Sequence, residues 1–329
     1  MSIGIALWCD QTREPEVLIR EAAAALHRAR RQSGGYAFHC GESEDSARRL
    51  TLMTELKRAI ERDELVLHYQ PKVDLRSHSL CSAEALVRWP HPQRGLIPPM
   101  EFIPLAEQTG LIKPLTYWVV EAALRQSRHW REAGTGLPLA VNLSAHNLHD
   151  PDLVDRIEAM IAGDWDTTDA NWTNPTVWNN ANADSAARAA RVDRIEAMLH
   201  ASDADPGQLE LELTESALME DPVGALDRLT RLKDMGIRIY IDDFGTGYSS
   251  LSYLQRLPVH SIKIDKAFVL NLTTQRSSAV IVRSAIDLAH DLDLGVVAEG
   301  VENQRVCDRL ETLGCDTAQG MYIGKPMPA

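Results

Sequence analysis

The segment Leu209-Glu210-Leu211-Glu212-Leu213 alternates aliphatic and acidic residues. A similar alternation recurs in Leu139-Ala140-Val141-Asn142-Leu143, Ile239-Tyr240-Ile241-Asp242, Ile262-Lys263-Ile264 and, more weakly, Val296-Val297-Ala298-Glu299. Because successive side chains of a β-strand point to opposite faces, each segment is expected to be a strand with an aliphatic face against helices and a polar face inward. In a parallel barrel, polar residues near the carboxyl ends of such strands meet at one mouth, where barrel enzymes carry their sites.

Short aliphatic strands alternate with longer helical segments from residue 65 onward. Strands are expected at residues 65–69, 79–87, 137–143, 208–213, 237–241, 260–264 and 295–298, and helices at 114–133, 222–235, 277–293 and 303–313. This alternation predicts a parallel sheet with crossover helices, and the number of units favours a closed barrel. An open doubly wound sheet is the alternative, although no G-x-G-x-x-G follows the first strand. We therefore expect an α/β fold, a TIM-like (β/α)8 barrel, over residues 63–329.

The residues ahead of the barrel form a short N-terminal α/β fragment. Strands are expected at residues 1–8 and 36–40, and helical spacing of apolar residues predicts helices at 15–32 and 44–62. Residues 1–41 are too few to form a stable core of their own. We interpret them as the remnant of a larger domain, and residues 42–62 as a linker helix.

The composition is that of a soluble globular protein, with 44% apolar and 25% charged residues among 329. The 34 Lys and Arg against 47 Asp and Glu give a net charge of −13, which disfavours a nucleic-acid polymer as the main partner. Five scattered cysteines without a C-x-x-C pair argue against disulfides or a zinc ribbon. No apolar run approaches the roughly 18–20 residues of a membrane-spanning helix. These features predict a cytoplasmic chain without a membrane segment.

One region interrupts the alternation of strands and helices. Residues 154–160 (VDRIEAM) recur as residues 192–198, an offset of 192 − 154 = 38 residues, and the segment between them is rich in Asp, Asn, Thr and Trp. We interpret residues 161–198 as a surface insertion or local duplication. A binding loop built on the three tryptophans is the alternative.

Acidic residues near the predicted strand ends form the candidate site. Five of them would lie in one cleft: Glu84, Glu212, Asp242, Asp243 and Glu299. Burying five negative charges is prohibitive without compensation. Two divalent cations would neutralise four of the charges, and Lys263 the fifth. The donors are all oxygens, including the amide of Asn142, with no clustered His or Cys, so Mg²⁺ or Mn²⁺ fits better than zinc.

An ordered set of motifs resembles the EAL-domain cyclic di-GMP phosphodiesterases. The motifs are AEALVRW (83–89), YQP (69–71), EFIPLAE (101–107), VNLS (141–144), ELTES (212–216), DDFGTGYSS (242–250), IKID (262–265), AEGVE (298–302) and QG (319–320). They cover roughly residues 50–329, and an ordered set is far more specific than a lone E-A-L. The resemblance implies metal-dependent hydrolysis of cyclic di-GMP to linear 5′-pGpG. A non-catalytic cyclic di-GMP receptor is the alternative, and hydrolysis of another phosphodiester is a third possibility.

The resemblance also implies roles for individual residues. One cation would be held by Glu84, Asn142, Glu212 and Asp242, and the second by Asp242, Asp243 and Glu299. The catalytic residues would be Glu299, Lys263 and Asp243, with the choice between Lys263 and Glu299 for activating water left open. Residues lining the substrate cleft would be Gln70, Leu86, Arg88, Asp265 and Gln319, with Arg88 on phosphate. The loop at residues 244–250 would be anchored by Glu215 and Glu302.

Further expectations follow from the same family. The barrel should contain one antiparallel strand, each site should take two Mg²⁺ or Mn²⁺ ions, Ca²⁺ should inhibit, and the protein should form a homodimer. Residues 1–41 resemble the C-terminal end of a GGDEF (diguanylate cyclase) domain through SIGIA (2–6) and ALHRAR (25–30). The Gly-Gly-Asp-Glu-Phe motif itself does not occur in this chain, so no cyclase activity is inferred.

Overall fold

Each segment in which aliphatic and polar residues alternate contains a β-strand in the computed structural model of the protein. The structure describes residues 2–6, 16, 18–20, 22–23, 25–26, 35–39, 42–162, 205–247 and 251–329. The chain divides into two compact units, Met1–Arg58 and Ala59–Ala329. In the first unit, β1 (Ser2–Ala6) pairs in parallel with β2 (Gly35–His39), and the helix α2 (Glu42–Glu61) follows. The described positions between residues 16 and 26 are helical, as predicted.

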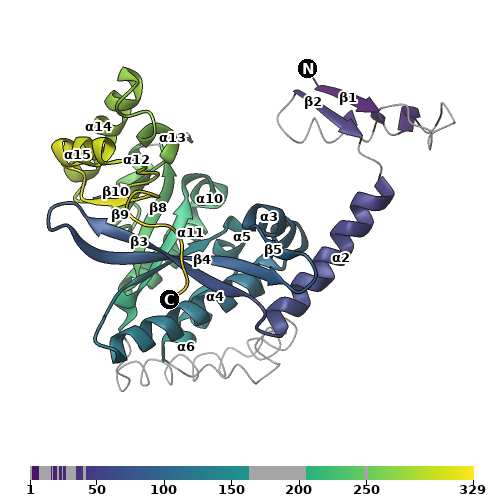
Figure 1. Cartoon of the computed structure of the whole chain (residues 1–329), viewed down its shortest axis with the longest axis horizontal. Coiled ribbons are helices and arrows are strands. Elements are labelled where there is room, and N and C mark those ends of the chain that lie inside the picture. The colour runs from purple at the N-terminus through teal and green to yellow at the C-terminus, as the bar shows by residue number, and fades with distance from the viewer. Residues whose placement is uncertain are drawn as a thin grey trace. The chain divides into compact units, whose positions relative to one another are not determined.

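Eight strands close into a barrel in the described part of the second unit (Figure 1). Their order around the ring is β3 (Val66–Asp74), β11 (Thr317–Gln319), β10 (Gly295–Ala298), β9 (Ser261–Ile264), β8 (Arg238–Phe244), β7 (Leu209–Thr214), β6 (Leu139–Leu143) and β4 (Ser79–His91). Pairing of β4 with β3 closes the ring, and β5 (Gly95–Ile97) extends β4 as an antiparallel strand. Within this described ring, β3 is antiparallel to both neighbours and the other neighbouring pairs are parallel. The predicted TIM-like barrel with one antiparallel strand is therefore confirmed, and the open sheet was the wrong alternative.

Helices of the second unit connect the barrel strands. Within the described residues they are α3 (Pro99–Thr109), α4 (Ile112–Glu132), α5 (Ala145–Leu148), α6 (Leu153–Ala162), η1 (Pro206–Gln208), α10 (Glu215–Glu220), α11 (Pro222–Asp234), α12 (Leu251–Leu254), α13 (Lys266–Val269), α14 (Arg276–Asp291) and α15 (Gln304–Leu313). Local sequence sets several of their ends. In α15, Asn303 accepts a hydrogen bond from the Val306 amide and caps the first turn, and Gly314 ends the helix with a φ of 80°.

The period-two pattern divides each strand between two environments. In β7, Leu209, Leu211 and Leu213 are buried, whereas Glu210 and Glu212 hydrogen-bond to polar residues of other barrel strands. Register brings polar positions of neighbouring strands together, because Asn142 of β6 pairs with Glu212 of β7. The aliphatic set therefore forms the core between sheet and helices, and the acidic set lies inside the barrel.

The structure corrects some element boundaries. The first barrel strand was expected to end at residue 69, but β3 continues through Pro71 to Asp74, with a register shift between Lys72 and Val73. Because proline cannot donate to the ladder, Pro71 is an unfavourable residue inside a strand, and the sequence around it does not indicate that β3 continues. The short strands β5 and β11 were not predicted, because three residues carry too little periodicity.

The repeated region is described only in part. The first copy of the repeat forms most of α6, whereas residues 163–204, which include the second copy and most of the predicted insertion, lie outside the described residues. No helix within the described residues is long and apolar enough to cross a lipid bilayer.

The packing of α3 against β4 gives a test of the fold. Phe102 of α3 is fully buried and lies edge-on to Trp89 of β4, with ring centroids 5.7 Å apart. Phe102→Ala should destabilise the protein by about 3–5 kcal/mol, because it removes buried area and leaves a cavity. Met100→Ala, on the same helix at an 89% exposed position, is the matched control. Equal thermal melting midpoints for the two variants would contradict this packing.

Candidate active site

Lys263 lies at the centre of the candidate site. Its side chain is fully buried on β9, and its Nζ atom contacts carboxylates from three other parts of the barrel. The distances are 2.5 Å to Oε2 of Glu212, 2.6 Å to Oε1 of Glu299 and 3.3 Å to Oδ1 of Asp242. Four predicted site residues from distant parts of the sequence are therefore in direct contact.

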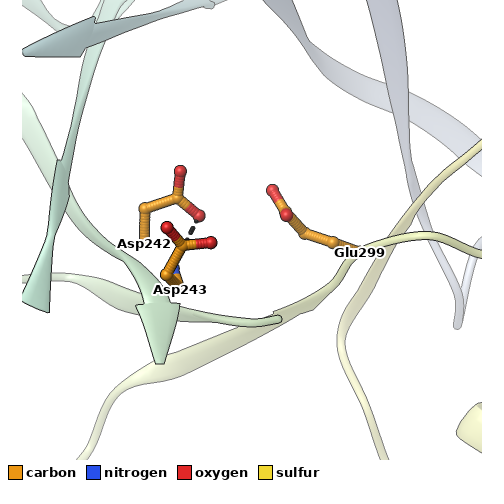
Figure 2. A group of neighbouring side chains, drawn as sticks. All are labelled: Asp242, Asp243 and Glu299. Atoms are coloured by element: carbon orange, nitrogen blue, oxygen red, sulfur yellow. Dashed lines mark hydrogen bonds between the residues drawn. The ribbon is translucent and has the colours of Figure 1, made fainter. Parts of the chain in front are cut away.

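Three acidic side chains form an open oxygen cluster beside Lys263. Asp242 and Asp243 lie at the end of β8, and Glu299 follows β10; Figure 2 shows the three carboxylates facing one another. Each can offer one oxygen such that the three atoms lie within 4.8 Å of one another. Asp243 adopts a left-handed backbone (φ 54°), and its amide donates to Oδ1 of Asp242 at 2.9 Å. This oxygen set fits a hard divalent cation such as Mg²⁺ or Mn²⁺.

A second group of predicted residues surrounds Glu84 of β4. Oε1 of Glu84 accepts a hydrogen bond from Nδ2 of Asn142 at 2.7 Å, and Oε2 accepts one from Nε2 of Gln319 at 2.5 Å. Nε2 of Gln319 also donates to Oε1 of Gln70 at 3.2 Å. The Oε1 atom of Gln319 is buried without a hydrogen-bond partner within the described residues, so it remains able to accept from a ligand.

The protonation of the cluster follows from its charges. Burial raises the pKa of Glu299 to about 7. The positive charge of Lys263 lowers this pKa, and the negative charges of Asp242 and Glu84 offset part of that effect. Burial and the charge of Asp242 similarly raise the pKa of Asp243 to about 6. Burial alone would raise the pKa of Glu212, but Lys263 and Lys72 reverse the effect and lower it to about 2. The cluster is therefore short of positive charge on the side of Asp243 and Glu299, where cation binding would supply it.

The substrate-side residues lie around this centre. Asp265 caps α13 by accepting from the Ala267 amide at 2.8 Å, and its proximity helps to raise the pKa of Asp243. Arg88 donates to the carbonyl oxygen of Val87, and burial lowers the pKa of its guanidinium against the opposing charge of Glu84. Leu86, between Glu84 and Arg88 on β4, is half-buried.

The two residues predicted to anchor the loop lie in different environments. Glu215 is buried at the start of α10, and its Oε2 accepts from the Gly245 amide at 3.3 Å. A Cβ atom added to Gly247 would lie 2.6 Å from its Oε1, so glycine permits this close approach. Glu302 is exposed, and within the described residues no hydrogen bond or ion pair links its side chain to the cluster.

Sequence reasoning missed a second buried cation, Lys72 of β3. Its Nζ atom lies 2.7 Å from Oε1 of Glu212 and 3.1 Å from Oε2 of Glu210. The sequence did contain a signal for it, because side chains two residues apart on a strand lie on the same face. Lys72 lies two residues after Gln70, and Glu210 lies two residues before Glu212. Because the predicted strand ended at residue 69, Lys72 was not assigned to a strand.

The fold and the site together define an α/β barrel whose mouth carries an oxygen-rich acidic cluster suited to a hard divalent cation. The model of the protein family described as the EAL domain matches residues 53–169 and 174–326 of this chain. The chain therefore belongs to the EAL domain family, which confirms the resemblance in the barrel motifs. A GGDEF remnant over residues 1–41 stays a prediction.

Known relatives match the whole chain. It is 39% identical over its full length to the bifunctional diguanylate cyclase/cyclic di-GMP phosphodiesterase MucR of Pseudomonas aeruginosa, covering 43% of that protein. It is 36% identical over its full length to the cyclic di-GMP phosphodiesterase PdeR of Escherichia coli, covering 44%. The solved PaMucR phosphodiesterase–c-di-GMP complex is 40% identical, with a TM-score of 0.69 over 85% of this chain and 98% of that chain. The chain thus spans less than half the length of these two curated relatives.

The raised pKa values predict that metal binding depends on pH. Glu299 and Asp243, with pKa values of about 7 and about 6, are largely protonated at ~pH 5.5 and ionised at ~pH 8. Because both values lie above those of the unfolded chain, the cluster destabilises the metal-free fold as pH rises through 7, and a cation offsets this repulsion. Mn²⁺ should therefore raise the thermal melting midpoint more at ~pH 8 than at ~pH 5.5.

The matched variant is Glu299→Gln. In this variant the gain in melting midpoint caused by Mn²⁺ should differ less between the two pH values, because one of the two protons that compete with the cation is removed. An equal gain in melting midpoint at both pH values in the unmodified protein would contradict this account.

Proposed function

We propose that this chain hydrolyses one phosphodiester bond of cyclic di-GMP to give linear 5′-pGpG, in a reaction that requires Mg²⁺ or Mn²⁺. The observation that carries the proposal is the convergence of Glu84, Asn142, Glu212, Asp242 and Glu299 at one end of the barrel. Membership of the EAL family and full-length identity to proteins named as cyclic di-GMP phosphodiesterases support the choice of substrate.

The donor set supports two cations with different surroundings. Glu84, Asn142, Glu212 and Asp242 would hold one, and Asp242, Asp243 and Glu299 the other. When bound, such cations supply Lewis-acid stabilisation of charge on the phosphate oxygens and lower the pKa of the attacking water. Ca²⁺, with longer and looser coordination, should bind but inhibit.

The chain's own residues then bind the substrate and handle the proton. Arg88 would hold a non-bridging phosphate oxygen, and Gln70, Leu86, Asp265 and Gln319 would line the cleft. Lys263, held by three carboxylates, is suited to orient the attacking water by donating to it. Glu299, whose Oε1 atom lies 2.6 Å from Nζ of Lys263, would accept a proton from that water. Asp243, whose carboxylate lies beside those of Asp242 and Glu299, would assist from the same side.

The remaining expectations from the family complete the proposal. We expect the reaction to take place in the cytoplasm and the protein to act as a homodimer, with Glu215 coupling the loop at residues 244–250 to the site. Residues 1–41 would be the C-terminal end of a GGDEF domain, and residues 42–62 the linker helix.

Removal of one metal ligand tests the reaction. Glu84→Gln keeps the shape of the side chain but removes its charge, and it should reduce turnover of cyclic di-GMP by at least about 100-fold, since loss of an outer partner alone costs 10–100-fold. Chromatography of the products with Mg²⁺ or Mn²⁺ measures this, and EDTA should abolish turnover. Glu132→Gln, at an exposed position of α4, is the matched control and should retain activity.

The same chromatogram separates the alternatives. A linear dinucleotide supports the proposal, whereas bound but unchanged cyclic di-GMP would indicate the non-catalytic receptor. Mononucleotide formed from linear dinucleotide, with cyclic di-GMP untouched, would indicate a different phosphodiester as substrate. Undiminished turnover in Glu84→Gln would contradict the assigned site.

A further inference from the structure

A second buried ion network lies beneath the candidate metal site. Lys72 is 1% exposed, and its Nζ atom contacts the carboxylates of both Glu210 and Glu212 and lies 5.0 Å from the ring centre of Tyr240. Glu210 also accepts hydrogen bonds from Ser82 Oγ at 3.1 Å and from the Tyr240 hydroxyl at 3.0 Å. The network thus joins β3, β4, β7 and β8 inside the barrel.

The two oxygens of Glu212 have separate partners. Oε1 is held by Lys72 at 2.7 Å and Oε2 by Lys263 at 2.5 Å, and the Glu212 side chain is fully buried. A carboxylate with one fixed oxygen cannot rotate freely about its last bond. Lys72 therefore fixes the orientation of the carboxylate, with one oxygen held at Lys72 and the other directed to the side where Lys263, Asp242 and Glu299 lie.

Stability alone is a poor explanation for this arrangement. Removing a lysine and a glutamate from water is unfavourable, and buried ion pairs can often be replaced by apolar residues without loss of stability. Lys72 and Glu210 also cancel each other's charge, so the pair leaves the net charge of the site unchanged. What the pair adds is a fixed direction for the Glu212 carboxylate.

We propose that Lys72 is a positioning residue that orients Glu212 for metal binding, with Glu210 as the counter-ion that holds Lys72 in place. This inference rests on the proposed function, because it assigns Glu212 as a metal ligand. Lys72 acts through Glu212 and contacts neither cation nor substrate. Partners that orient a metal ligand in this way contribute about 10–100-fold to metal affinity.

The test compares variants of equal net charge. Lys72→Met/Glu210→Gln removes the positive and the negative charge together. The glutamine oxygen can still accept from one of the two hydroxyl groups of Ser82 and Tyr240, and the glutamine NH2 group can donate to the other. Tyr240→Phe is the matched control, because it removes one hydrogen bond to Glu210 and leaves Lys72 on Glu212. Binding of Mn²⁺ alone is measured by the loss of the free-ion electron paramagnetic resonance signal, and turnover of cyclic di-GMP is measured separately.

The double variant should bind Mn²⁺ at least about tenfold more weakly than the unmodified protein, and the Mn²⁺ concentration that half-activates turnover should rise in parallel. Tyr240→Phe should bind Mn²⁺ with nearly unchanged affinity. If Lys72→Met/Glu210→Gln does not fold by circular dichroism, Lys72→Met/Glu210→Met replaces it, with the same charge and the same expected loss.

Unchanged or tighter Mn²⁺ binding by a folded double variant would overturn the role of Lys72. A different result would contradict the proposed function: the unmodified protein would bind Mn²⁺ but leave cyclic di-GMP intact. Because the decisive measurement is metal binding, the comparison for Lys72 can still be made in that case.

Discussion

Charge inside the barrel constrains the rest of the structure. Carboxylates from β7 and β8 and from the residue after β10 lie around the fully buried Lys263, and Glu84 of β4 adds its negative charge to theirs. Lysines hold Glu212 in its charged form, whereas Asp243 and Glu299 retain raised pKa values. The strands that carry these residues must therefore be held in a fixed register, because a one-residue slip would turn each carboxylate into the apolar layer.

The aliphatic layer provides that register. Residues such as Leu211, Ile239 and Ile262 are fully buried on the outer side of the strands, and they alternate with the acidic and basic residues inside. The apolar and polar requirements are thus met by the same two-residue period. This explains why a fold stabilised by burial of apolar area also places its charged residues accurately.

Much of this arrangement could be predicted from sequence because it depends on local periodicity. Alternation in the LELEL segment fixed both the strand and the phase of Glu212, and the ordered motifs indicated which other residues would meet it. Lys72 was missed because Pro71 concealed the continuation of β3, and β11 because three residues give no period. The hydrogen bond from Gln319 to Glu84 joins residues 235 positions apart, a contact that only ring closure brings about.

The direction of β3 has a consequence for how the barrel is joined to whatever precedes it. In an all-parallel barrel, the first strand begins on the face opposite the catalytic mouth. Here Val66, the first residue of β3, pairs with Arg88, which lies beyond Glu84 toward the carboxyl end of β4. The polypeptide thus enters at the rim of the cleft and runs inward past Gln70 to Lys72. The shortest covalent path from α2 to the reactive centre is therefore a single strand.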